Sequence, residues 1–239
     1  MTLPSPESKP VKKENPLLSL AVNIAIPSLV LMKLSREDRL GATVGLLVAL
    51  AFPVTYLIVD FYRSRKTNFI SVLGLVSILL TGGIGLMKLQ AHWIAVKEAA
   101  VPGIIGCVIL GSMRTKFPLV KKLLYNDTIF DCRRIEEALA GQSKEIAFDG
   151  LMARSSYVVA ASFFLSSALN YGLAKYILHS DPGSVTFNEE LGKMTALSWP
   201  VIVVPSMLVM MLALWQLLHG IKKLTGLELE QIFHGQEKK

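Results

Sequence analysis

Long runs without Asp, Glu, Lys or Arg alternate along this chain with shorter charged segments. Six such runs cover residues 17–32, 40–59, 67–87, 99–113, 155–174 and 194–221. A helix needs roughly 20 residues to cross a hydrocarbon core about 30 Å thick, and most of the runs reach that length. The pattern predicts an all-α, polytopic membrane helix bundle with about six transmembrane helices.

Two of the runs are short. The fourth reaches spanning length if its helix begins near Ala91 and takes Lys97 and Glu98 into its outer part. The first gains from Lys33, whose ammonium can reach back to the interface, but whether this run spans stays open. A cleaved signal peptide in residues 1–32 is the competing interpretation. It is disfavoured because prolines recur through the leading segment and no small-residue cleavage site follows the apolar run.

Basic residues predict the orientation of the spans. Alternate segments, beginning with the N-terminal one, hold 18 Lys and Arg against seven in the others. Cytoplasmic loops carry such an excess, so both termini are predicted to be cytoplasmic. The predicted organisation is a cytoplasmic N-terminal tail (1–16), a four-span half (17–113), a cytoplasmic loop (114–154), a two-span half (155–221) and a cytoplasmic tail (222–239).

Composition narrows the function classes. The 239 residues are 52% hydrophobic and 18% charged, whereas soluble proteins have about 25% charged residues. The net charge of +7 is explained by the Lys and Arg residues of the predicted cytoplasmic segments. The predicted partner is therefore the lipid bilayer and not nucleic acid. The two cysteines and four histidines show no metal-ligand spacing, and no phosphate loop or nucleophile elbow is present. We therefore predict no metal, no cofactor and no enzymatic activity.

The long cytoplasmic loop shows two helical patterns. Phe117, Val120, Leu123 and Leu124 recur at helical spacing with Lys116, Lys121 and Lys122 between them, which predicts an interfacial helix. Its basic residues are expected to contact anionic lipid headgroups, with partner binding as the alternative. The charged residues from Arg133 to Glu137 then predict a short solvated helix that ends at Gly141.

Two spans carry small or polar residues on one face. In the third span Gly74, Thr81 and Gly85 fall within a narrow arc, which favours close helix packing, with a substrate path as the alternative. In the fifth span Asn170 continues a stripe begun by Ser162 and Ser166. An amide facing lipid is costly, so Asn170 is expected to hydrogen-bond to another helix.

Lys97 and Glu98 are the candidate intramembrane functional residues, because an ionisable group at membrane depth is costly to insert. Adjacent residues lie about 100° apart on a helix, so the two side chains are not expected to face each other. Lys97 is expected to extend toward the interface and Glu98 to seek another helix or water. A structural role and a transport role both stay open.

The order of these features resembles the bacterial intracellular septation protein A family and its six-span relatives. The resemblance covers residues 17–221 and is most specific in the segment after the fourth span, where Lys116 is followed by Pro118, Leu119 and further basic residues. It also includes Asn68–Phe69–Ile70, Thr81–Gly82–Gly83, Trp93, Lys97, Phe163 and Asn170. It implies an inner-membrane protein linked to cell division and envelope maintenance, without established enzymatic activity.

The predicted function is therefore a non-catalytic membrane protein of the envelope or of septation. Its expected partners are the bilayer, membrane proteins of the envelope or division machinery, or a second copy of the chain. A small transporter or channel, with Lys97, Glu98 and Asn170 near its path, is the alternative, and a lipid-modifying membrane enzyme is the third reading.

Overall fold

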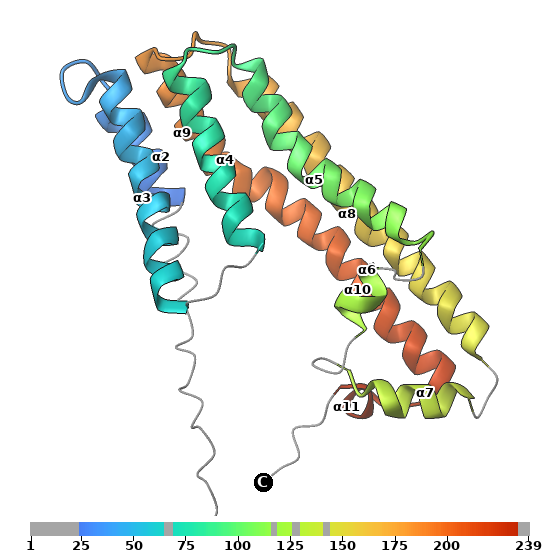
Figure 1. The fold of residues 1–239 in the computed structure, drawn as a ribbon. Helices are drawn as coiled ribbons and strands as arrows, with labels where there is room; N and C mark the ends of the chain where they lie inside the picture. The colour runs from blue at the N-terminus through green and yellow to red at the C-terminus, as the bar shows by residue number, and fades with distance from the viewer. Residues whose placement is uncertain (1–23, 65–68, 116–118, 126–129, 141–143, 234–239) are drawn as a thin grey trace, which may run out of the picture. The chain divides into compact units, whose positions relative to one another are not determined.

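Helices make up nearly all the regular structure of this protein (Figure 1). The computed structural model describes residues 24–64, 69–115, 119–125, 130–140 and 144–233. Within these ranges one antiparallel bridge, between Phe130 and Phe233, is the exception to the helical pattern. The predicted all-α class is confirmed.

Four helical segments in the described residues are long and apolar enough to cross a membrane. They are Gly41–Val59, His92–Ser112, Glu145–Ile177 and Val185–Thr225. Two of the six predicted spans are not established. Residues 17–23 of the first run lie outside the described residues, and the helix that covers most of the third run, Phe69–Leu86, is not among the four.

The chain divides into two compact units, and both predicted halves contribute to each of them. Unit 1 contains residues Met1–Leu89 and Ser180–Ala196. Its described elements are α2 (Ile26–Leu29), the π-helix η2 (Val30–Leu34), α3 (Gly41–Ser64), α4 (Phe69–Leu86) and most of α9 (Val185–Ser198).

Close packing in unit 1 depends on a glycine and an asparagine of α9. A side chain at Gly192 would meet the Ser28 carbonyl oxygen at 2.9 Å, so α9 can approach α2 only because this residue is glycine. One turn earlier, the buried Asn188 donates from Nδ2 to the Ala42 carbonyl of α3 at 2.6 Å. Such small residues and cross-helix hydrogen bonds are typical of helix contacts in membranes.

Unit 2 contains residues Gln90–His179 and Leu197–Lys239. Its helices are α5 (His92–Ser112), α6 (Leu119–Leu124), α7 (Cys132–Ala140), α8 (Glu145–Ile177), η3 (Trp199–Val203), α10 (Val204–Thr225) and α11 (Leu229–Ile232). The 33-residue α8 packs against both α5 and α10, and α7 and α11 lie together at one end (Figure 1).

The contact between α5 and α8 is built on small residues. Gly106 faces the Phe164 ring, and a side chain there would lie only 3.0 Å from it. Gly103 faces Ser167, whose hydroxyl donates across the helix pair to the Ala99 carbonyl at 2.7 Å. The start of α5 at His92 confirms that the fourth span begins near Ala91.

The segment before the sixth span differs from the prediction. Asp181, Pro182 and Gly183 form a turn, with Gly183 at a φ of +88° and the Ser184 amide bonded to the Asp181 carbonyl. Helix α9 begins directly afterwards at Val185, nine residues before the predicted run. The polar residues of α9 do not stop the helix, because its apolar residues pack within unit 1.

Candidate functional site

The two charged residues of α5 form an ion pair. Lys97 Nζ lies 2.7 Å from Glu98 Oε1, and the two side chains are 8% and 28% exposed. The expectation that they cannot face each other was wrong. Their Cα–Cβ bonds do diverge by about 100°, but both side chains are long enough for their charged ends to meet beside the helix.

The two residues leave α5 in different directions relative to its contact with α8. Lys97 precedes Gly106 by nine residues, two and a half helical turns, so its Cα–Cβ bond points to the opposite side of α5 from that glycine, whereas that of Glu98 lies about 80° from it. Trp93, the second residue of α5, lies one turn earlier, so Lys97 is about 6 Å further along the helix axis. A charge as little exposed as that of Lys97 is costly unless it is paired, and Glu98 supplies the pairing.

Asn170 forms its hydrogen bonds within its own helix. Its Nδ2 donates to the Ser166 carbonyl at 2.8 Å and approaches the Ser166 hydroxyl at 3.4 Å. Among the described residues, the structure assigns it no bond to another helix, so the predicted interhelical partner was wrong. A residue four positions back offers a carbonyl within reach of a short polar side chain, which satisfies the amide locally.

The predicted small face of the third span is a contact surface at its C-terminal end. A Cβ at Gly85 of α4 would lie 2.6 Å from Leu46 Cδ2 of α3, whereas one at Gly83 would meet nothing within 4 Å. Thr81 donates its hydroxyl to the Ser77 carbonyl of the same helix. The surroundings of Gly74 lie outside the described residues. The geometry around Gly85 favours packing over a substrate path.

The basic residues of the predicted interfacial helix have different positions. Lys116 and the side chain of Lys122 lie outside the described residues. Lys121 of α6 forms an ion pair with Asp149 of α8 at 3.1 Å, and its ammonium also lies 5.7 Å from the centre of the Phe148 ring. The neighbouring Val120 is buried in a cluster with apolar residues of α5, α8 and α10. Helix α6 therefore packs against protein on this side.

A folded module joins the predicted loop to the predicted C-terminal tail. We call it the cap: α7, α11, the start of α8 and the end of α10. Its apolar core consists of Tyr125, Phe130, Ile135, Leu139, Phe148, Met152, Leu217, Ile221 and Ile232. Helix α7 confirms the short helix predicted before Gly141, and it buries Ile135 and Leu139 in this core.

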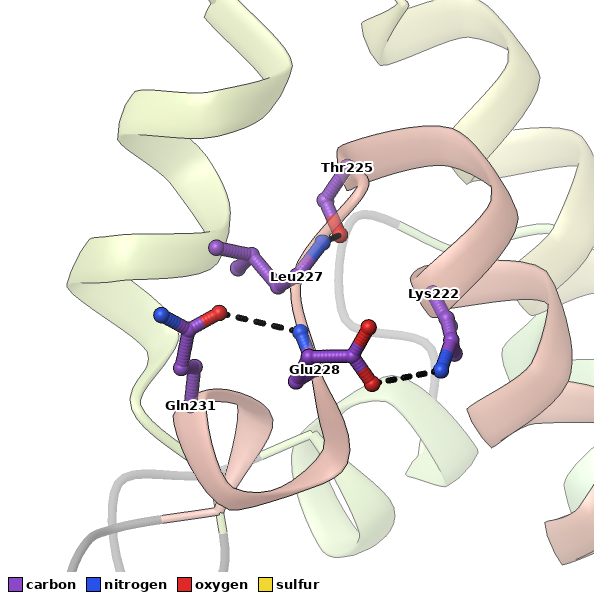
Figure 2. Close-up of polar contacts among 5 residues, drawn as sticks. All are labelled: Lys222, Thr225, Leu227, Glu228 and Gln231. Carbon is purple, nitrogen blue, oxygen red and sulfur yellow. Dashed lines mark hydrogen bonds and ion pairs between the residues drawn. The ribbon is translucent and has the colours of Figure 1, made fainter.

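The tail is fixed to the rest of the cap by polar contacts. Gly226 ends α10 in the left-handed conformation, with a φ of +74°, and turns the chain back. Figure 2 shows Glu228 at the centre of the turn: its amide donates to Gln231 Oε1 at 3.0 Å and its carboxylate receives Lys222 Nζ at 2.6 Å. The amide of Asp131 donates to the Ile232 carbonyl, which attaches the tail to the start of α7.

The cap was not anticipated because its two parts are about 100 residues apart. The available signal was apolar: Leu227, Leu229, Ile232 and Phe233 follow the last span, in a tail otherwise dominated by charge. Amphipathic α7 needs a surface for its apolar side, and this short segment supplies it.

No metal centre is assembled in the part of the chain that the structure describes: no three His, Cys, Asp or Glu side chains come close enough to hold an ion. Comparisons of the chain with protein families, with curated proteins and with solved structures find no match. The candidate functional features are thus the Lys97–Glu98 pair and the cap.

Proposed function

We propose that this protein is a non-catalytic scaffold of the bacterial inner membrane, acting in envelope maintenance or septation. The resemblance described above and the four apolar helices support this proposal. The distribution of basic residues favours cytoplasmic termini, and with them a cytoplasmic cap.

The observation that carries the proposal is the cap itself. Its nine core residues come from a loop, a tail and two long helices, and they form a folded surface at one end of α8 and α10. Arg133, Arg134, Glu136 and Glu137 of α7 are exposed on its outside, and the Arg133–Glu137 pair is too solvated to contribute much stability. A folded surface with exposed charges is suited to a protein partner of the envelope or division machinery, or to a second copy of the chain.

The test uses bacteria that lack this protein and two variants at matched membrane abundance. One variant replaces Arg133 and Arg134 by Glu on the cap surface; the other replaces Lys97 and Glu98 by Gln within α5. Complementation is scored as cell length and survival under envelope stress. The scaffold proposal expects only the cap variant to fail. Failure of the α5 variant together with success of the cap variant would overturn it.

A small transporter or channel is the second candidate, and the Lys97–Glu98 pair favours it. Ionisable groups within a span commonly mark an ion or proton path. Under this proposal neutralising both residues abolishes flux in vesicles while the protein still inserts. The cap variant then transports normally, so the same two variants separate the two functions.

A further inference from the structure

One side of α8 is exposed along its whole length. Its exposed positions recur every three or four residues, and they include Ile146, Gly150, Tyr157, Ala161 and Ala168. Two large aromatic residues of α8 are also exposed: Tyr157 on this stripe is 60% exposed, and Tyr176, about 100° around the helix from it, is 79% exposed. They are 19 residues apart, which is about 28 Å along a helix. That distance matches a hydrocarbon core of about 30 Å.

A tryptophan of α10 lies at the level of Tyr157. The two helices run in opposite directions: a side chain at Gly220 would collide with Leu151, and Ala213 shares a core with Val159 and Ala160. This register places Trp215 opposite residues 156–157. Trp215 is 63% exposed, and its ring stacks on His219. Tyr157 and Trp215 therefore form one exposed aromatic level on neighbouring helices.

A second aromatic level lies at the other end of unit 2. The His92 ring, at the start of α5, meets Tyr171 of α8 edge-on with 6.4 Å between centroids. The next residue, Trp93, is 54% exposed. The contacts of Gly103 with Ser167 and of Gly106 with Phe164 set an antiparallel register that places Trp93 opposite residue 177, next to Tyr176. Trp and Tyr with one exposed side are enriched at both membrane–water interfaces, because the rings are apolar and carry a polar group.

The charge distribution agrees with these two levels. Residues 155–174 of α8 and residues 194–221, which include most of α10, contain no charged side chain. Arg154 and Lys175 flank the uncharged stretch of α8. On α5 the charged side chains between the two levels are Lys97 and Glu98, and they neutralise each other.

We propose that the bilayer interfaces cross unit 2 at Tyr157 with Trp215 and at Trp93 with Tyr176. This proposal rests on the membrane location proposed above and adds the depth of each element. Residues 145–156 of α8, about 18 Å of helix, then project beyond the hydrocarbon and contribute Phe148 and Met152 to the cap core. Val120 of α6 shares a buried cluster with Val159, and Tyr125, directly after α6, lies in the cap core, so α6 connects the interface to the cap, whereas α7 and α11 lie outside the interface.

The proposed positions of the bilayer interfaces give Lys121 a different role from the one that the sequence predicts. Its ammonium reaches Asp149, eight residues beyond Tyr157 and about 12 Å further from the bilayer centre. The side chain therefore extends away from the membrane toward the cap, and its partner is a carboxylate of the protein. The register thus assigns Lys121 to the attachment of the cap, although the sequence predicts a contact with lipid headgroups.

The test places single cysteines on the exposed stripe of α8, in a chain without Cys107 and Cys132. Ile146→Cys and Gly150→Cys lie beyond Tyr157, and Ala161→Cys and Ala168→Cys lie between the two aromatic levels. All four positions are exposed, and Gly150 has open space for a side chain. Open membrane fragments are treated with a charged, water-soluble maleimide, which gives the reagent access to both sides. The same variants unfolded in SDS show that each thiol is reactive.

The expected result is rapid labelling at positions 146 and 150, and labelling at least about tenfold slower at 161 and 168, because maleimide requires the hydrated thiolate. Protection of Gly150→Cys, or rapid labelling of Ala161→Cys, would overturn the register while leaving the protein in the membrane. Failure of the membrane proposal looks different: the protein would appear in the soluble fraction and all four cysteines would react alike.

Discussion

The Lys97 ammonium lies 2.7 Å from the Glu98 carboxylate, although the two residues are adjacent in the chain and leave α5 in directions about 100° apart. A charge pair made by neighbours needs no second helix to supply the counter-charge. Helix α5 therefore carries both the charge and its counter-charge, one turn beyond Trp93. The pair is a property of one helix, and this makes its energetic role testable in isolation.

Removing only the Glu98 carboxylate should lower the free energy of unfolding more than removing the charges of both Lys97 and Glu98. Glu98→Gln takes this counter-charge away from Lys97, which is 8% exposed, whereas Lys97→Gln combined with Glu98→Gln leaves no charge at the site. Breaking a buried pair costs about 3–5 kcal/mol, and we expect a value near or below the lower end because Glu98 is partly exposed. The measurement is thermal unfolding in detergent, analysed as a double-mutant cycle.

The control for this cycle is Glu136→Gln, since Glu136 is exposed on α7. Its effect should be within about 0.5 kcal/mol. If Glu98→Gln is no more destabilising than this control, or if the double variant shows the sum of the single effects, the pair contributes no coupling energy.

Adding a side chain at Gly85 should destabilise the protein, whereas adding one at Gly83 should not. A Cβ at Gly85 would lie 2.6 Å from Leu46 Cδ2, and one at Gly83 would meet nothing within 4 Å. Gly85→Leu should cost at least about 1–3 kcal/mol through overpacking. Gly83→Ala should be neutral or stabilising by about 0.5–1 kcal/mol, since alanine favours helices. The measurement is thermal unfolding of both variants. Equal losses of stability would show that Gly85 is not at a packing surface.

Truncating Ile232 should release the C-terminal tail from the cap. Its side chain is fully buried in the cap core, so Ile232→Ala should cost about 2–5 kcal/mol of local stability. The neighbouring Leu229 is exposed and supplies the matched control, Leu229→Ala. Limited proteolysis should cleave the Ile232 variant near residue 226 faster than the control. Similar cleavage rates would mean that the tail is not held by this core.

Local patterns in the sequence predict local structure well. The start of α5 near Ala91 follows from the length a span requires, and α7 follows from the charged residues between Arg133 and Glu137 that precede Gly141. The turn at Asp181–Pro182–Gly183 follows from residues with known backbone preferences. In each case the deciding interactions lie within one or two helical turns.

Contacts that depend on distant residues or on flexible side chains were not predictable in this way. The cap pairs Phe130 with Phe233, and no periodicity relates residues so far apart. Helical angles place the Cβ atoms of Lys97 and Glu98 but not their charged ends, which several rotatable bonds separate from the backbone. Asn170 could bond along its own helix or across to another, and only packing decides between them.

The cap includes the start of α8, and the Asp181 turn follows the end of α8 in the chain, so we expect the two to lie on opposite sides of the membrane. The distribution of basic residues predicts a cytoplasmic cap and an external turn. Single cysteines at Glu136, exposed on α7, and at Asp181, exposed in the turn, test this without disturbing either core. In intact cells an impermeant maleimide should label Asp181→Cys only, and Glu136→Cys should react after permeabilisation. Labelling of Glu136→Cys in intact cells would invert the orientation and remove the cap from the cytoplasmic partners of septation.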